Sequence, residues 1–170
     1  AAYRMLKQQA DLPPLHIHLH KQIPTGAGLG GGSADAAFML RALNNHFCMG
    51  LAEEVLEEFA AALGSDCAFF IRNKPALAKG RGEVLQPVGA DLGGYYLVVV
   101  YPGFGVSTKE AYAGITPSKP RYALEELAAK PPEEWSGLLV NDFEKGIFHK
   151  YPALGRIKAQ LYELGAVYAS

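Results

Sequence analysis

Cysteine is scarce in this chain. Cys48 and Cys67 are the two among 170 residues, and Cys67 lies in the apolar stretch Cys67–Phe70. Small secreted domains that depend on disulfides carry more cysteines than this, which excludes a disulfide framework. We therefore expect a cytoplasmic, reducing location.

An excess of charge of one sign is also absent. Acidic and basic side chains nearly balance, with a formal net charge of −1 and a pI of about 6.6. Domains that bind nucleic acids or anionic membranes through bulk electrostatics are strongly basic. We expect neither partner, and the sequence indicates no oligomeric state.

Long apolar runs are missing as well. No stretch is long and apolar enough to cross a bilayer, and no signal peptide opens the chain. With 49% hydrophobic and 19% charged residues, the composition is that of a globular protein with a core. The chain opens within a helix and closes in a short apolar run, so we expect it to be part of a longer protein.

Glycine, in contrast, is concentrated in one loop. Residues 26–32 read Gly-Ala-Gly-Leu-Gly-Gly-Gly, between an alternating run and a helix rich in small residues. Glycine tolerates positive φ and lets a ligand approach the backbone closely. The start of the next helix adds unpaired N–H groups and partial positive charge, which attract phosphate. The sequence predicts a nucleotide or phosphate site here.

Two familiar phosphate-binding patterns do not explain this loop. The P-loop needs a lysine after its last glycine, and none follows Gly32. The pattern G-x-G-x-x-G is present in residues 26–31, but it belongs in a strand–helix–strand unit, and here a second helix is expected next. A structural role, in which the glycines only permit tight packing, stays open as an alternative.

The apolar patterns predict an α+β fold, with strands early and helices dominating later. Alternation predicts a half-buried strand at Leu15–Ile23, and a β-prone run predicts another at Tyr95–Tyr101. The turn at residues 79–82 predicts a hairpin between Ala76–Ala78 and Glu83–Gln86. The expected helices are Tyr3–Ala10, about Ser33–Phe47, Leu51–Leu63, a short one ending at Ala113, Tyr122–Ala129, Leu139–Phe148 and Ala153–Leu164.

Two sets of polar side chains leave alternatives open. His16, His18 and His20 share one face of the Leu15–Ile23 run, where they either hold a metal or form a solvated strand face. Asp66 stands directly before an apolar run, where it either caps the next turn or acts in catalysis.

The stretch Pro24–Ala37 resembles the signature loop of the GHMP kinases, the superfamily of galactokinase, homoserine kinase, mevalonate kinase and phosphomevalonate kinase. The triple glycine before Ser-Ala-Asp-Ala-Ala resembles one branch in particular, the 4-diphosphocytidyl-2-C-methyl-D-erythritol kinases of the non-mevalonate isoprenoid pathway. Further segments resemble this branch in the expected order: Lys21 before Ile23-Pro24, Gly64–Phe70, Ala78–Glu83, Pro102–Thr108 and Asn141–Glu144.

The resemblance implies a two-lobed α+β fold without its N-terminal strands and its C-terminal end. An ATP-binding domain would span residues 1–114, and a second domain would begin at 115–170. The implied reaction is the ATP-dependent phosphorylation of the 2-hydroxyl of 4-diphosphocytidyl-2-C-methyl-D-erythritol. Because a family lysine near the N-terminus and a third glycine-rich motif are not in the sequence, we expect little turnover from these 170 residues alone.

The resemblance also implies the roles of individual residues. Asp66 corresponds to the catalytic aspartate, and Ser33 would offer its hydroxyl to a phosphate or to Mg²⁺. Thr108 and Tyr112 match the positions that hold the cytidine end, although Tyr112 could also be one apolar residue of a short helix. The implied ATP-binding residues are Lys21, Pro24, Thr25, Gly26, Ala27, Gly28, Leu29, Gly30, Gly31, Gly32, Ser33 and Ala34.

Two rival functions stay open. One is another GHMP kinase that acts on homoserine, mevalonate or a sugar. The other is a non-catalytic module that binds nucleotides or nucleic acids, which would have a basic face and no need of Asp66.

Overall fold

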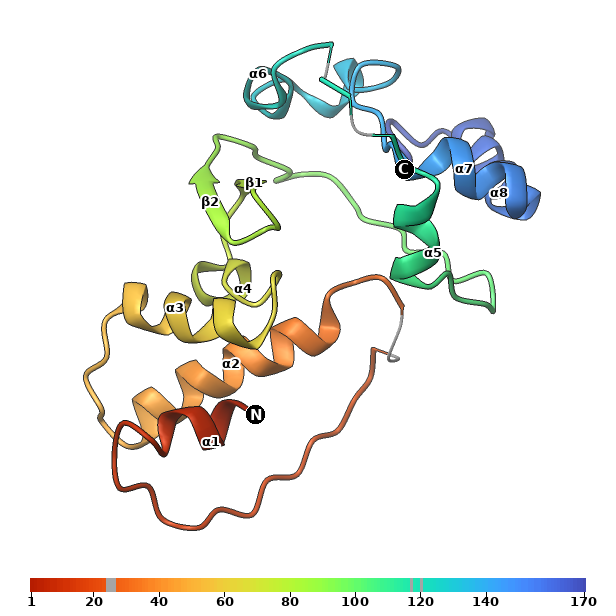
Figure 1. Cartoon of the computed structure of the whole chain (residues 1–170). Helices are drawn as coiled ribbons and strands as arrows, with labels where there is room; N and C mark the ends of the chain where they lie inside the picture. The colour runs from red at the N-terminus through yellow and green to blue at the C-terminus, as the bar shows by residue number, and fades with distance from the viewer. Residues whose placement is uncertain (24–26, 117, 120) are drawn as a thin grey trace. The chain divides into compact units, whose positions relative to one another are not determined.

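The computed structural model describes residues 1–23, 27–116, 118–119 and 121–170. They form two compact units, Ala1–Pro87 and Val88–Ser170, each of which is described by itself. In the described ranges, helices combine with a two-stranded sheet (Figure 1), which confirms the α+β class. The predicted domain boundary at residue 114 stays a prediction.

Packed helices form the core of the first unit. They are α1 (Ala2–Leu6), α2 (Gly31–His46), α3 (Glu53–Leu63) and α4 (Phe69–Arg72). Their apolar residues recur at steps of three and four, so each helix turns one stripe inward. The buried cluster consists of Ala2, Leu6, Leu12, Ala37, Leu40, Leu43, Leu56, Ala60, Cys67 and Ile71. The core therefore fixes the start of α2 relative to the short helix α4.

The predicted hairpin is confirmed. Strands β1 (Ala76–Lys79) and β2 (Val84–Pro87) pair antiparallel, with Ala76 opposite Pro87. In the turn, the backbone N–H of Arg81 donates to the carboxylate of Glu83 at 2.7 Å. A short loop and a side-chain contact within the turn are local features, which is why the sequence alone could predict the hairpin.

The two other predicted strands are wrong. Leu15–Ile23 and Tyr95–Tyr101 have no helix or ladder assignment, and in Figure 1 they run as plain trace. Apart from Leu15, which packs against the core, most of their apolar side chains are exposed: Leu19 is 57% exposed and Tyr96 99% exposed. Alternation favours an extended backbone, but a strand also needs a neighbour for its N–H and C=O groups. The described part of the chain offers neither run such a neighbour.

The three histidines at 16, 18 and 20 are exposed on the first of these runs. Within the described ranges, no three or more His, Cys, Asp or Glu side chains are grouped so that they could hold a metal ion. The structure therefore favours the solvated face over the metal site.

The second unit is built of short helices. They are α5 (Thr108–Ala113), α6 (Leu124–Ala128), the 3₁₀ helix η1 (Pro132–Glu134), α7 (Phe143–Lys150) and α8 (Pro152–Glu163). The sequence did not predict η1. The other four confirm the predicted helices to within a few residues at each end, apart from a later start of α7 at Phe143. Across both units, none of the described helices combines the length and the apolar character that a membrane span requires.

Candidate active site

The glycine loop leads into α2 through left-handed backbone. Gly28 has φ +75° and Gly30 has φ +64°, in the region that L side chains rarely adopt. Gly30 is the N-cap of α2, and no side chain caps the helix there. Pro24, Thr25 and Gly26, predicted to bind ATP, lie outside the described residues.

Among the described residues, the first N–H groups of α2 have no acceptor within the helix. The first helical bond runs from the Ala34 N–H to the Gly30 carbonyl at 2.9 Å, so the amides of the preceding residues have no partner inside the helix. Most helices satisfy such groups with a Ser, Thr, Asp or Asn side chain. With a glycine as the N-cap, an anionic group is the natural acceptor.

A lysine adds charge at the same place. The Nζ of Lys21 lies 3.9 Å from the position that a Cβ on Gly31 would take. It forms an ion pair with Asp35 on α2, and both side chains are about one-third exposed, 29% and 35%. The positive end of the helix and the lysine ammonium thus lie together at the predicted phosphate position.

The remaining loop positions flank this point. Ala27 and Leu29 lie in the bend before α2, and Leu29 is 46% exposed. Gly32, Ser33 and Ala34 belong to the first turns of α2, where Ser33 is half-buried. Each is located as the sequence predicts, and their roles toward ATP stay predictions.

Asp66 lies in the turn between α3 and α4 and is exposed. The N-cap of α4 is Ala68, and no side chain caps that helix. This overturns the alternative in which Asp66 caps the next turn. Among the described residues, no hydrogen bond or ion pair involves the Asp66 carboxylate, which leaves it available to a substrate.

The hairpin turn packs against Asp66. A Cβ on Gly82 would lie 3.5 Å from Oδ1 of Asp66 and 3.5 Å from the Ser65 carbonyl oxygen. Gly82 has φ +114°, so the turn relies on glycine at this contact. The Gly-Arg-Gly turn predicts a hairpin but not this contact, because the pairing of distant loops has no local signature in the sequence.

A second contact joins the glycine loop to the segment after Asp66. The ring of Phe70 on α4 reaches within 3.0 Å of the Cβ position of Gly30. The glycine loop and the Asp66 turn are therefore parts of one packed arrangement in the first unit. This contact was also missed by sequence analysis.

Thr108 and Tyr112, predicted to hold the substrate, belong to the second unit. Thr108 is the first residue of α5, and the Tyr112 side chain is 64% exposed on the same helix. The Tyr112 ring meets the Phe143 ring edge to face, with centroids 5.1 Å apart and an interplanar angle of 84°. How this pair lies relative to Asp66 stays a prediction.

A cavity of about 600 Å³ opens elsewhere in the first unit, beside α3 and the hairpin. Its lining includes Glu57, Arg72 and Lys74 but none of the predicted site residues. The Arg72 guanidinium is paired with Glu57 and also with Glu54 at 3.3 Å. Because carboxylates of α3 already balance this arginine, the cavity is not a second anion site.

Comparison with known proteins agrees with these features. The family model described as the GHMP kinases N terminal domain matches residues 1–74. The chain is 52% identical over 99% of its length to a 4-diphosphocytidyl-2-C-methyl-D-erythritol kinase of Bacteroides thetaiotaomicron, and 48% identical to one of Parabacteroides distasonis. One from Porphyromonas gingivalis is 40% identical over 97% of the chain. The chain spans about 62% of the length of the first two relatives and 61% of the third.

Proposed function

We propose that the chain belongs to the GHMP kinases, whose N-terminal domain model matches residues 1–74, and that the whole protein phosphorylates 4-diphosphocytidyl-2-C-methyl-D-erythritol with ATP, at its 2-hydroxyl. The observation that carries the proposal is the start of α2, where uncapped N–H groups, left-handed glycines and the Lys21 ammonium meet. Such a start favours the phosphates of a nucleotide. The names of the relatives support the choice of alcohol.

The glycine loop and the first turn of α2 would bind the ATP phosphates. Lys21 would lie beside them, held by its ion pair with Asp35. Phosphoryl transfer depends mainly on positioning and on charge stabilisation, which donors fixed by the fold supply before the reaction begins.

Mg²⁺ would accompany the nucleotide and neutralise part of the phosphate charge. The Ser33 hydroxyl fits as one oxygen ligand, with phosphate and water oxygens as the others. In the described ranges, no cluster of three or more His, Cys, Asp or Glu side chains could bind an ion independently. This agrees with an ion that arrives on the nucleotide.

Asp66 would accept or orient the proton of the attacking alcohol. The new bond joins the alcohol oxygen to the γ-phosphorus, the bond from that phosphorus to the β–γ bridging oxygen breaks, and ADP leaves. The exposed carboxylate and its freedom from a capping role support this assignment. General-base assistance of this kind contributes about 10²–10⁴-fold to the rate.

Thr108 and Tyr112 would hold the cytidine end of the substrate. The exposed ring of Tyr112 offers a surface on which a base could stack, and stacking of this kind is worth about 1–3 kcal/mol per base in single-strand-binding proteins.

We also propose the two-lobed fold of the family. Residues 1–114 would form the ATP-binding lobe, and 115–170 the beginning of the second lobe. Two free cysteines, Cys48 and Cys67, support a cytoplasmic location.

The test is ADP release by the whole protein with the diphosphocytidyl alcohol, beside homoserine, mevalonate and galactose in parallel reactions. We expect release with the first alcohol alone, and a loss of about 10²–10⁴-fold in Asp66→Asn with ATP binding retained. Asp11→Asn is the matched control, since Asp11 is also exposed in the first unit.

Each alternative has its own outcome. Release with another alcohol would keep the kinase and replace the substrate. ATP binding without release from any alcohol, unaffected by Asp66→Asn, would favour the non-catalytic module. Full activity of Asp66→Asn would overturn the role of Asp66.

A further inference from the structure

Phe143 supports the side chain that the proposed function assigns to the substrate base. Its ring meets Tyr112 edge to face at 5.1 Å. Tyr112 stays 64% exposed, so this contact covers part of the ring and leaves the rest open. Edge-to-face pairs have a preferred geometry, so Phe143 restricts the directions in which the Tyr112 ring can point.

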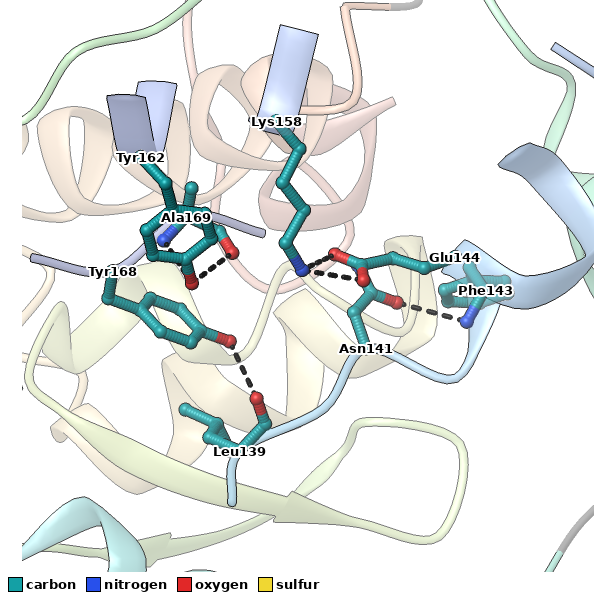
Figure 2. A network of polar contacts seen from close by, with 8 residues as sticks. All are labelled: Leu139, Asn141, Phe143, Glu144, Lys158, Tyr162, Tyr168 and Ala169. Carbon is teal, nitrogen blue, oxygen red and sulfur yellow. Dashed lines mark hydrogen bonds and ion pairs between the residues drawn. The ribbon is translucent and has the colours of Figure 1, made fainter. Parts of the chain in front are cut away.

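Phe143 is itself held in place by the polar contacts drawn in Figure 2. Its backbone N–H donates to Oδ1 of Asn141 at 3.1 Å, at the point where α7 begins. The next residue, Glu144, accepts two hydrogen bonds from Lys158 Nζ, at 2.7 and 2.6 Å. These side chains are only 16% and 26% exposed, which shields the ion pair from solvent screening.

Helix α5, which carries Tyr112, is joined to α7 at two further points. The backbones approach closely where a Cβ on Gly146 would lie 3.7 Å from the Gly114 carbonyl oxygen. Near the other end of α7, the Glu110 carboxylate accepts from Lys150 at 2.5 Å and from the Tyr151 hydroxyl at 2.8 Å. These contacts fix α5 relative to α7, and therefore fix the position of the Tyr112 backbone relative to Phe143.

We propose that Phe143 is a positioning residue, which holds the Tyr112 ring in the orientation that receives the pyrimidine base of the substrate. This inference rests on the proposed function. It gives a role to the segment Asn141–Glu144. Asn141 and Glu144 fix the start of α7, and Phe143, held there, restricts the orientation of the Tyr112 ring.

The experiment compares Phe143→Leu with the wild-type whole protein. The KM for the diphosphocytidyl alcohol should rise between about twofold and about tenfold, the range that an aromatic pair of this kind is worth. The kcat and the KM for ATP should stay unchanged. Phe143→Tyr keeps the aromatic edge and should restore the wild-type KM, an outcome that general destabilisation would not produce.

Phe148→Leu is the matched control. Phe148 is half-buried on the same helix, and its ring lies 3.4 Å from the Cβ position of Gly155 on α8. The substitution is the same but removes no Tyr112 contact, so the KM for the alcohol should not change. If Phe143→Leu does not fold, Phe143→Met replaces it, because methionine fills the space without an aromatic edge.

A double variant tests whether Phe143 affects the KM through Tyr112. If Phe143 acts through Tyr112, Phe143→Leu should add no further rise in KM to Tyr112→Leu. Equal KM values for wild type and Phe143→Leu, in an active enzyme, would overturn the inference and leave the proposed function intact. A wild-type protein that does not use the diphosphocytidyl alcohol would overturn both.

Discussion

Both the backbone conformation and the packing require a glycine at position 30. Its φ of +64° suits glycine, and the Phe70 ring occupies the space where a side chain would begin. The same residue is the N-cap of α2. The packing of α4 and the backbone conformation of Gly30 thus set the shape of the glycine loop where it enters α2.

The first prediction concerns this residue. Gly30→Ala should lower the free energy of unfolding by about 1–2 kcal/mol, because the methyl group disfavours left-handed backbone, and by more if Phe70 has to move. Gly32→Ala is the control: it lies within α2, and a Cβ there would have no atom within 4 Å. Urea denaturation of the two variants measures the difference, and equal stabilities would contradict the prediction.

At the residue scale, the sequence indicated candidate site residues but not the contacts that support them. The glycines, Ser33 and Asp66 were identified from local pattern and resemblance. The support that Gly82 gives to Asp66, and Phe143 to Tyr112, could not be predicted, since both join residues far apart in the chain. Such pairs depend on tertiary packing, which a single sequence does not reveal.

At the scale of elements, the contact between α5 and α7 depends on charge. The hydrogen bond from Lys150, and next that from the Tyr151 hydroxyl, hold the pKa of Glu110 below its ordinary value. The same contact with Glu110 raises the pKa of Lys150. A lowered carboxyl pKa stabilises the fold above the ordinary pKa of glutamate, and this contribution is lost as the pH falls through the lowered value.

The second prediction follows from the lowered pKa of Glu110. The wild-type chain should be more stable than Glu110→Gln near neutral pH, and the difference in melting temperature should shrink as the pH falls below about 4. On the alkaline side it should shrink again as the pH rises through the raised pKa of Lys150. Added salt should reduce the difference, because Lys150 is 60% exposed. A difference that is constant from pH 3 to pH 7 would contradict this account.

Elements with local signals were predicted, and those that need a distant partner were not. Helix α2 and the β1–β2 hairpin have their apolar spacing and turn residues within one short segment. The run Leu15–Ile23 has the right alternation, yet it forms no ladder with the described residues. Alternation indicates which side chains share a face, but it does not say what lies beside the backbone.

At the scale of the whole molecule, the candidate functions are divided between two units. The glycine loop and Asp66 belong to Ala1–Pro87, whereas Tyr112 and Phe143 belong to Val88–Ser170.

The last prediction concerns the apolar run Tyr95–Tyr101. It reads Tyr-Tyr-Leu-Val-Val-Val-Tyr, without charge, proline or glycine, and Leu97 and Val98 are 88% and 70% exposed. An extended, β-prone segment of this kind is a template for pairing between chains. The isolated 170-residue chain should therefore self-associate as its concentration rises, and Val98→Lys should suppress this.

Leu164→Lys is the control, since Leu164 is 84% exposed but lies outside the run. Light scattering over a concentration series measures the effect. Equal suppression by both variants would mean that added charge alone is responsible, whereas suppression by Val98→Lys alone would identify the run as the surface through which the chains pair.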